Sequence, residues 1–454
     1  MFRKILIANR GEIAVRIIRA CREMGIATVA VYSEADREAL HTQLADEAVC
    51  IGPAAATDSY LNMEQILSAC IATKADAIHP GFGFLSENSR FVEMCEKCNI
   101  TFIGPTAEMM DKMGNKSQAR LTMIEAGVPV VPGTKEPVYD AKRGAAMAED
   151  IGYPVMIKAS SGGGGKGMRI AFGPDDFEEN FQVAQLESVR GFGDNTMYIE
   201  KYVQEPRHIE FQIMADKFGN VIHLGERDCS IQRNHQKMIE ESPSAAVSPE
   251  LREKMGHAAV TAAKAAGYVN AGTIEFLLEP DGKFWFMEMN TRIQVEHPVT
   301  EWVTGIDLVK EQLKIASGMP LEISQEDVRI QGHAIECRIN AENPQKNFRP
   351  SPGTIQGAHF PGGNGIRVDT CVYNGCKIPP YYDSMLAKLI VHAGNRKEAI
   401  AKMQSALGEV IIDGIDTNID YQYEILKDED YQSGNFDTGF LASHIIAGVK
   451  INEN

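Results

Sequence analysis

The sequence has few of the features that mark membrane, secreted or nucleic-acid-binding proteins. No apolar run approaches the roughly 18 residues of a membrane-spanning helix, and the apolar start at residues 1–8 is too short for a signal peptide. The nine cysteines are odd in number and scattered, which argues against a disulfide framework. The net charge of −17 argues against nucleic acid or an anionic membrane as a partner. We therefore expect a cytoplasmic protein that meets anionic ligands with local basic residues.

Two common nucleotide-binding motifs are also missing. The turn Asn9-Arg-Gly-Glu12 has one glycine where a dinucleotide fingerprint needs three, which argues against NAD. A Walker A loop needs a glycine at position 160 and a Ser or Thr after Lys166, and the chain has neither. Cys95-Glu-Lys-Cys98 has no second cysteine pair, so we interpret it as ordinary helix cysteines and not as a zinc or redox site.

The hydrophobic pattern changes along the 454 residues in a way that predicts two or three domains. Up to about residue 110, short apolar runs alternate with amphipathic segments, which predicts a doubly wound parallel sheet. The expected strands are residues 4–8, 28–32, 75–79 and 101–104, and the expected helices include 12–24 and 63–73. From Lys116 onward the pattern predicts an α+β fold, with strands at 209–213 and 221–224 and a helix that Ser248-Pro249 opens.

A run of four glycines lies between two segments with strand character, residues 153–158 and 168–172. Glycine allows backbone N–H groups to approach phosphate oxygens closely, and Lys158 and Lys166 add positive charge. The pattern predicts a hairpin that acts as a phosphate-binding flap, with a flexible surface hairpin as the alternative.

The second informative segment is Phe284-Trp-Phe-Met-Glu-Met-Asn-Thr-Arg-Ile-Gln-Val-Glu296. Its start is apolar on both faces, as in a central strand, and its later part alternates, with one parity that is entirely polar. An edge strand with one solvated face is the alternative. Glu275 lies on another apolar stretch, and Glu275, Glu288 and Asn290 offer the hard oxygen ligands that magnesium prefers.

Two further polar segments stand out. Residues 226–237 are too mixed for a core; they are interpreted either as an anion-binding segment that uses His235 and Lys237 or as a solvated loop. Residues 197–203 are a predicted strand whose end carries Glu200 and Lys201, and His208 follows shortly after.

Together these segments resemble biotin carboxylases of the ATP-grasp superfamily from Ile5 to about Asn418. Besides the glycine flap with Lys158, the resemblance rests on Ile7-Ala-Asn-Arg-Gly-Glu-Ile-Ala14, His79-Pro-Gly-Phe-Gly-Phe-Leu-Ser-Glu-Asn88, Glu226-Arg-Asp-Cys-Ser230, Glu288-Met-Asn-Thr-Arg-Ile-Gln-Val-Glu-His-Pro-Val-Thr300 and Phe348-Arg-Pro-Ser-Pro-Gly353. Position 82 is Phe where the family usually has Tyr, a departure that bears on any hydroxyl contact to biotin. Lys166 keeps the charge of a position where relatives have Arg.

The resemblance implies an α/β and α+β architecture of three domains. These are a doubly wound, Rossmann-like N-terminal domain (residues 1–114), an ATP-grasp domain (115–330) with a mobile glycine-rich lid at about 131–203, and a mixed α/β C-terminal domain (331–447). The implied reaction is ATP- and bicarbonate-dependent carboxylation of biotin through carboxyphosphate. The biotin is held on a carrier protein, and Mg²⁺ or Mn²⁺ assists.

The resemblance also assigns residues. The phosphates and nucleotide are assigned to Lys116, Lys158, Gly164, Gly165, His208 and His235, with adenine at the backbone of Glu200, Lys201, Tyr202 and Val203. The metal is assigned to Glu275, Glu288 and Asn290, and bicarbonate to Lys237, Arg292, Gln294 and Val295. Glu296 is the candidate base for the bicarbonate proton, and Arg338 is expected to steady the biotin enolate.

The implied assembly is acetyl-CoA carboxylase, which makes malonyl-CoA for fatty acid biosynthesis. No Met-Lys-Met biotinylation site is present, so we expect the biotin carboxyl carrier protein and the carboxyltransferase to be separate chains, and a homodimer of this chain. A subunit of a pyruvate or other acyl-CoA carboxylase is the alternative. Other ATP-grasp enzymes, such as purine-pathway carboxylases and carbamoyl-phosphate-like synthases, and a non-catalytic nucleotide-binding module are also considered.

Overall fold

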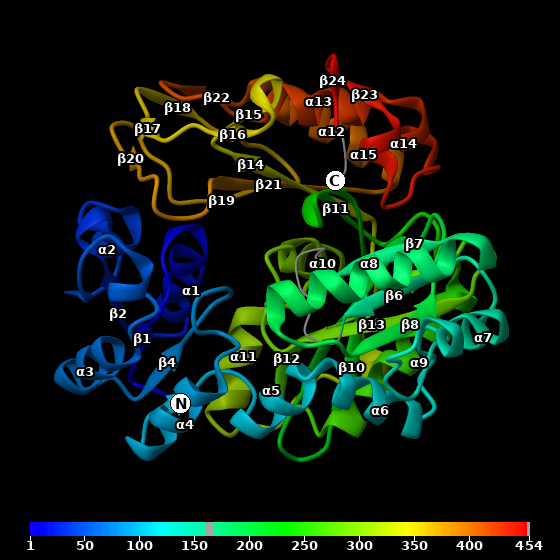
Figure 1. The fold of residues 1–454 in the computed structure, drawn as a ribbon. Helices are drawn as coiled ribbons and strands as arrows, with labels where there is room; N and C mark the ends of the chain where they lie inside the picture. Colours follow the sequence, from blue (N-terminus) through cyan, green and yellow to red (C-terminus); the bar gives the residue numbers. More distant parts are fainter. Residues whose placement is uncertain (160–166, 452–454) are drawn as a thin grey trace. The chain divides into compact units, whose positions relative to one another are not determined.

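The computed structural model describes residues 1–159 and 167–451, which form two compact units (Figure 1). Unit 1 comprises Met1–Val128, Arg207–Leu278 and Glu288–Asn454, and unit 2 comprises Pro129–Pro206 and Glu279–Met287. All nine cysteines, each of them described, are free thiols. Among the described residues, no helix is both long enough and apolar enough to cross a membrane.

The N-terminal part of unit 1 is a five-stranded parallel sheet with the order β3-β2-β1-β4-β5. Its strands are β1 (Lys4–Ile7), β2 (Ala27–Tyr32), β3 (Glu47–Cys50), β4 (Ala77–His79) and β5 (Thr101–Phe102). The helices of this part are α1 (Gly11–Glu23), α2 (Leu40–Leu44), α3 (Met63–Thr73), α4 (Ser89–Lys97) and α5 (Ala107–Gly114). Along β1, Ile5 and Ile7 pack in one core with α1, whereas Leu6 packs in another with α3 and α4. The sheet is therefore covered on both faces, and the predicted doubly wound fold is confirmed.

The rest of unit 1 is organised around an eight-stranded sheet, β13-β12-β9-β10-β11-β14-β21-β19, in which the first four residues of β13 are counted with unit 2. Its strands are β9 (Arg207–Ala215), β10 (Val221–Arg233), β11 (Gln236–Ser242), β12 (Asn270–Leu278), β13 (Phe284–Asn290), β14 (His333–Asn340), β19 (Ile366–Thr370) and β21 (Met385–Ala393). From β12 to β19, neighbouring strands pair in antiparallel orientation. β11 pairs directly with β14, so the predicted boundary at 330/331 lies between two neighbouring strands of one sheet.

Helices cover this sheet, and short strand pairs complete the C-terminal part. The helices are α6 (Lys116–Glu125), α9 (Pro249–Ala266), α10 (His297–Thr304), α11 (Leu308–Ala316), α12 (Arg396–Glu409), α13 (Ile419–Lys427), α14 (Glu429–Ser433) and α15 (Phe440–Ser443). The pairs are β15 (Glu342–Asn343) with β16 (Arg349–Pro350), β17 (Gly353–Thr354) with β20 (Lys377–Ile378), β18 (Gly357–His359) with β22 (Ile411–Asp413), and β23 (Ile445–Ile446) with β24 (Val449–Lys450). Ser248 caps α9 by accepting a hydrogen bond from the Leu251 N–H, as the sequence predicts.

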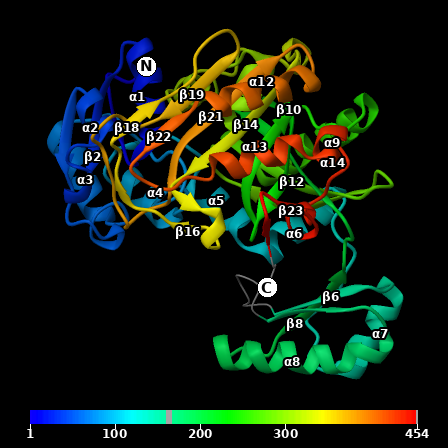
Figure 2. The same ribbon diagram turned by 90° about the horizontal axis from the view of Figure 1, so that it is seen from above.

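Unit 2 is a three-stranded antiparallel sheet, β7-β6-β8, with two helices (Figure 2). Its elements are β6 (Val155–Ala159), β7 (Met168–Ala171), β8 (Met197–Lys201), α7 (Ala141–Ile151) and α8 (Pro174–Phe192). Alternate residues of β6, Val155 and Ile157, are buried against α8. β6 and β7 pair on either side of the glycine run, so the predicted hairpin flanks are confirmed, while residues 160–166 themselves lie outside the described residues.

The structure corrects two expectations. The polar segment 226–237 is not a solvated loop, because it forms most of β10 and the start of β11, and Arg227 is completely buried. The segment 284–296 is not a central strand that continues to Glu296. β13 is an edge strand, Met287 on it is 39% exposed, and the strand ends at Asn290. Residues 291–296, here called the strap, leave the sheet and lead into α10.

Candidate active site

The centre of the candidate site is the ammonium group of Lys237, which lies among three carboxylates. Its Nζ is 2.5 Å from Glu210 on β9, 3.0 Å from Glu275 on β12 and 2.7 Å from Glu296 at the end of the strap. Glu210 and Glu275 are direct partners in the β9–β12 pairing, so the two carboxylates lie side by side. Burial lowers the pKa of Lys237, but the three carboxylates outweigh it and hold the pKa well above its usual value. Lys237 is therefore a fixed positive charge at neutral pH.

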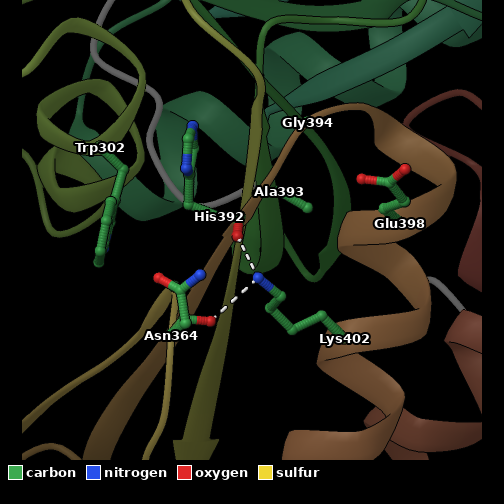
Figure 3. A pocket seen from close by; sticks show the side chains of 8 residues that line it. Trp302, Asn364, His392, Ala393, Gly394, Glu398 and Lys402 are labelled. Atoms are coloured by element: carbon green, nitrogen blue, oxygen red, sulfur yellow. Dashed lines mark hydrogen bonds between the residues drawn. The ribbon is translucent and has the colours of Figure 1, made fainter.

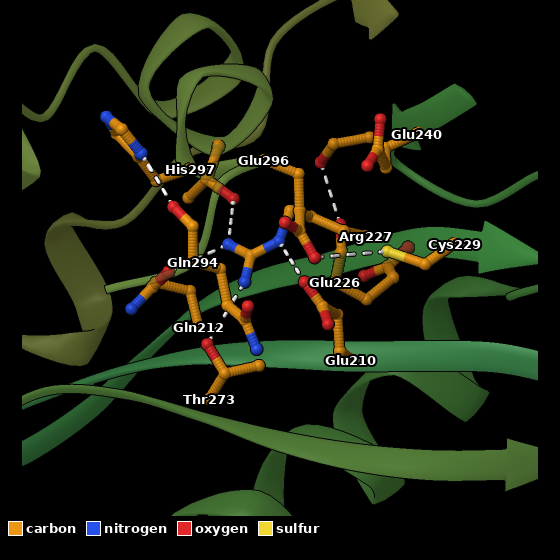
Figure 4. A network of polar contacts seen from close by, with 12 residues as sticks. Glu210, Gln212, Glu226, Arg227, Cys229, Glu240, Thr273, Gln294, Glu296 and His297 are labelled. Atoms are coloured by element: carbon orange, nitrogen blue, oxygen red, sulfur yellow. Dashed lines mark hydrogen bonds and ion pairs between the residues drawn. The ribbon is translucent and has the colours of Figure 1, made fainter. Parts of the chain in front are cut away.

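Arg227 on β10 holds one of these carboxylates, Glu210, in place (Figure 4). Its Nε donates to Glu210 at 2.5 Å, and its other nitrogens donate to Gln212, Thr273 and Thr300 at 2.8–3.1 Å. A guanidinium group with no solvent contact has to find its acceptors in the protein, and these side chains accept from four of its five N–H groups. Sequence reasoning assigned Arg227 no role, although it lies in one of the motifs that carry the family resemblance.

Arg338 on β14 faces Glu296 from the other side. Its Nη2 lies 3.0 Å from Glu296 Oε2, and its Nε donates to Glu240 on β11 at 2.6 Å. Burial raises the pKa of Glu296, but Lys237, Arg338 and Arg227 outweigh it and hold the pKa well below its usual value. Glu296 is thus ionised and able to accept a proton. An anion that drew the cations toward itself would increase its proton affinity.

Glu240 behaves differently from Glu296. Burial raises its pKa to about 7, although Arg338 opposes the change. Two carboxylates that share one arginine therefore differ in proton affinity, which is the arrangement that separates acid and base roles in enzyme sites.

The strap presents Arg292 and Gln294 next to this cluster. Arg292 Nη1 donates to Gln294 Oε1 at 2.8 Å, and Gln294 Nε2 lies 3.3 Å from Glu275. Glu87 orients the arginine by accepting from its Nε at 3.0 Å and from the Thr291 N–H at 2.9 Å. Glu87 was not predicted, although it lies in the motif at 79–88. The only signal was that motif, because 205 positions separate Glu87 from Arg292.

The three predicted metal ligands lie beside Lys237. Asn290 Nδ2 donates to Glu275 Oε1 at 2.8 Å, and His208 Nε2 is 3.0 Å from Glu275 Oε2. Burial raises the pKa of Glu288, and the charge of Glu275 raises it further. A divalent cation would relieve this repulsion by taking oxygens of both carboxylates as ligands, so Glu275 and Glu288 fit magnesium. The Asn290 Oδ1 accepts from Arg292 Nη2 at 3.3 Å, so the amide would have to turn to add its oxygen.

The predicted phosphate and adenine residues are found in both units. In unit 1, Lys116 begins α6, and His235 lies in the β10–β11 turn at φ 62°; both are exposed. In unit 2, Lys158 Nζ on β6 is 2.5 Å from Glu200 on β8. The N–H groups of Lys201 and Tyr202 donate to the carbonyls of Pro132 and Pro154, so these two N–H groups are not available to adenine. Gly164 and Gly165 lie outside the described residues.

A cavity of about 480 Å³ in unit 1 is separate from these residues (Figure 3). It is lined by Trp302, Asn364, Gly365, His392, Ala393, Gly394, Glu398 and Lys402. The Lys402 ammonium already donates hydrogen bonds to the backbone carbonyls of Asn364 and His392, at 3.0 and 2.7 Å. The cavity therefore offers no lysine charge that is available to an anion. For this reason it is a weaker candidate for the reaction than the charged cluster around Lys237.

Family models match three successive parts of the chain. Their descriptions are biotin carboxylase, N-terminal domain, for residues 1–110; carbamoyl-phosphate synthase L chain, ATP binding domain, for 115–324; and biotin carboxylase C-terminal domain for 336–443. Biotin carboxylase 1 of Bacillus subtilis (strain 168) is 58% identical over 449 residues, which are 99% of this chain and 100% of that protein. The chain belongs to the biotin carboxylase family. The resemblance drawn from the sequence is confirmed.

Other relatives agree with this assignment. A biotin carboxylase of Nostoc sp. (strain PCC 7120 / SAG 25.82 / UTEX 2576) is 58% identical and covers 97% of this chain and 98% of its own length. A solved structure of the biotin carboxylase domain dimer of Hydrogenobacter thermophilus 2-oxoglutarate carboxylase is 51% identical, with a TM-score of 0.90 and 98% of each chain covered. That structure is a complex with MgADP, ADP and bicarbonate. The chain is thus an ATP-grasp ligase of the biotin carboxylase type, with the three-domain α/β architecture that the sequence predicts.

Proposed function

We propose that this chain carboxylates biotin held on a biotin carboxyl carrier protein, using ATP and bicarbonate, as the first half-reaction of acetyl-CoA carboxylase. The observation that carries the proposal is the placement of the Glu296 carboxylate between Lys237 and Arg338, with the strap arginine nearby. The complex of the Hydrogenobacter thermophilus relative with MgADP and bicarbonate supports the choice of substrates.

The first step takes place on bicarbonate. Lys237, Arg292, Gln294 and the Val295 N–H hold the anion; the planar fork of Arg292 suits a planar oxyanion. Glu296 removes the bicarbonate proton. A bicarbonate oxygen then attacks the γ-phosphorus of ATP, the bond to the β-phosphate oxygen breaks, and carboxyphosphate and ADP form.

The second step takes place on biotin. Carboxyphosphate breaks down to CO2 and phosphate, and the phosphate takes the proton from the ureido nitrogen. Arg338 stabilises the enolate-like oxygen of biotin by its charge, and the nitrogen attacks CO2 to give carboxybiotin. Phe82 offers no hydroxyl in this pocket, so Arg338 carries the polar recognition there.

The other predicted residues are assigned to the nucleotide and its metal ion. Lys116, Lys158, His235, Gly164 and Gly165 bind the phosphates, His208 lies near the nucleotide, and the backbone of residues 200–203 binds adenine. Mg²⁺ or Mn²⁺ held by Glu275, Glu288 and Asn290 would neutralise triphosphate charge. Unit 2, formed by Pro129–Pro206 and Glu279–Met287, supports a lid at about 131–203. The domain boundaries at 114/115 and 330/331 are part of this proposal.

The partners follow from the reaction. We propose a homodimer in the cytoplasm that receives biotin from a separate carrier protein and passes carboxybiotin to a separate carboxyltransferase. The dimeric form of the Hydrogenobacter thermophilus domain supports the homodimer.

Transfer of labelled carbon tests the proposal. Purified protein with Mg-ATP, ¹⁴C-bicarbonate and free biotin should form acid-labile labelled carboxybiotin, and omission of ATP should abolish it. Labelled biotin that forms without ATP, or no label on biotin, would contradict the proposal. With the carrier and a carboxyltransferase added, label in malonyl-CoA supports the acetyl-CoA carboxylase assignment, whereas label passing to pyruvate alone contradicts it.

A further inference from the structure

Lys388 on β21 is a completely buried lysine whose ammonium reaches the strap. Its side chain has no exposed surface, and its Nζ donates to the carbonyl of Val295 at 2.8 Å. This carbonyl belongs to the peptide that joins Val295 to Glu296. A single hydrogen bond from a buried charge therefore holds the backbone directly before the candidate base.

The counter-ion of Lys388 comes from the other end of the chain. Glu12 in the first turn of α1 places Oε1 at 3.2 Å from the ammonium, and Asp369 on β19 is 4.0 Å away. The Phe82 ring centre lies 5.8 Å from the same nitrogen. Lys388 thus joins the N-terminal sheet region, the C-terminal strands and the strap at one point.

Strand pairing fixes where Lys388 points. Lys388 is the direct partner of Arg338 in the β14–β21 pairing and of Asp369 in the β19–β21 pairing. Directly paired residues of antiparallel strands project to the same face. Lys388 therefore lies next to the proposed biotin arginine and on its face of the sheet.

Burial of the Lys388–Glu12 ion pair is unfavourable for the free energy of folding. Removal of an ammonium and a carboxylate from water costs several kcal/mol per ion, and apolar residues of similar size are often as stable or more so. Neither oxygen of Glu12 has a hydrogen-bond partner of good geometry among the described residues. Stability alone is thus a poor reason for this pair, whereas a fixed donor for the Val295 carbonyl is a specific one.

We propose that Lys388 is a positioning residue for bicarbonate. It orients the peptide between Val295 and Glu296, and Glu12 is the counter-ion that compensates its buried charge. The inference rests on the proposed function, in which Gln294 and the Val295 N–H bind bicarbonate and Glu296 takes its proton. Loss of the Lys388 hydrogen bond misplaces these groups, while the nucleotide residues Lys116 and Lys158 stay unaffected.

The test compares Lys388→Met, Glu12→Gln and the double variant. Lys388→Met leaves Glu12 buried without its counter-ion, so a lower melting temperature is expected, and the double variant should regain most of it. Both variants that lack Lys388 should show a KM for bicarbonate raised about 10-fold or more and a lower kcat, because small misplacements of reacting groups are costly. Their KM for ATP should stay within about 2-fold of wild type. Glu12→Gln keeps the donor to Val295 and should stay within about 3-fold in all kinetic constants.

Two outcomes separate the possibilities. If the double variant regains both the melting temperature and the bicarbonate KM of wild type, Lys388 is only half of a structural ion pair and the positioning role is overturned. The same holds if the KM values for ATP and bicarbonate rise together. Wild-type protein whose ATP turnover does not need bicarbonate would instead contradict the proposed function.

Discussion

The two units place their lysines in contrasting electrostatic surroundings. In unit 1, Lys237 is 12% exposed and contacts three carboxylates that are themselves buried. In unit 2, Lys158 is 40% exposed and contacts Glu200, which is 20% exposed. Charges in a dry environment interact strongly and keep their geometry, whereas a half-exposed pair is screened by water and exchanges partners at little cost. The difference agrees with the roles proposed above, in which Lys237 binds bicarbonate within a fixed charge cluster and Lys158 binds a phosphate of ATP.

The largest expected effect comes from the buried cluster. Lys237→Met leaves Glu210, Glu275 and Glu296 without their shared cation, so ATP turnover with bicarbonate should fall about 100-fold or more. The melting temperature should also fall, because the carboxylates stay buried. Steady-state kinetics and thermal unfolding check both effects. Lys283→Met, which breaks an exposed pair with Asp281, is the matched control and should leave both within error. A Lys237 variant that keeps more than a tenth of wild-type turnover would contradict the anion-site assignment.

The second prediction separates the two steps within unit 1. Arg338→Gln should lower the biotin-dependent rate about 100-fold, because a developing negative charge loses its nearest cation. Turnover of ATP with bicarbonate alone should fall less than about 10-fold, since Lys237 and Arg227 still flank Glu296. The two rates are measured in parallel on one preparation. Equal losses in both would mean that Arg338 serves the bicarbonate step instead.

A smaller effect is expected in unit 2. Lys158→Gln should raise the KM for ATP about 10-fold, while the melting temperature changes by no more than about 1 °C, because exposed ion pairs contribute roughly 0–1 kcal/mol. Glu200→Gln is the matched control, since it removes the same ion pair but keeps the lysine. A similar rise in KM for both variants would show that the ion pair, and not the Lys158 charge, matters for ATP.

The effect that is smallest at neutral pH concerns His41, a histidine that is completely buried. Burial lowers the pKa of His41 to about 4, although Asp36 opposes the change. The unfolded chain takes up a proton below about pH 6.5, but the folded protein does not. The free energy of unfolding should therefore fall as the pH is lowered from about 6.5 to 4, with no contribution from this group above that range. Urea unfolding at several pH values measures this slope, which should be shallower for His41→Gln; an unchanged slope would contradict the assignment.

The sequence predicted the local structure well where the hydrophobic period was regular. The four predicted parallel strands, the Ser248 cap and the hairpin flanks were correct, because each depends on residues close together in the chain. The fifth strand, β3 (Glu47–Cys50), was not predicted. The segment 284–296 shows the limit of this approach. Its even positions do gather at one site, but they do so because the chain leaves the sheet after Asn290, and an alternating pattern cannot distinguish a strand from such a strap.

The predicted site residues all lie in or near recognisable motifs. The residues that the sequence did not predict contact them directly but are far away in the sequence. Glu87, Arg227 and Lys388 each fix a predicted residue or its backbone, yet they lie on elements that only the tertiary fold brings together. Arg227 also shows why composition misled, since a solvated loop was one of two interpretations of its mixed-charge segment. Its carboxylate and hydroxyl partners come from three other segments of the chain. The sequence around Arg227 therefore does not show the hydrogen bonds that allow its charge to be buried.

Phosphate release from Mg-ATP, measured with and without bicarbonate and free biotin, tests the central claim most directly. The claim is that the buried cluster around Lys237 and Glu296 activates bicarbonate for transfer to biotin. Release that requires bicarbonate and rises when biotin is added is the predicted result. Release that is indifferent to both would contradict the account, even if the protein hydrolyses ATP.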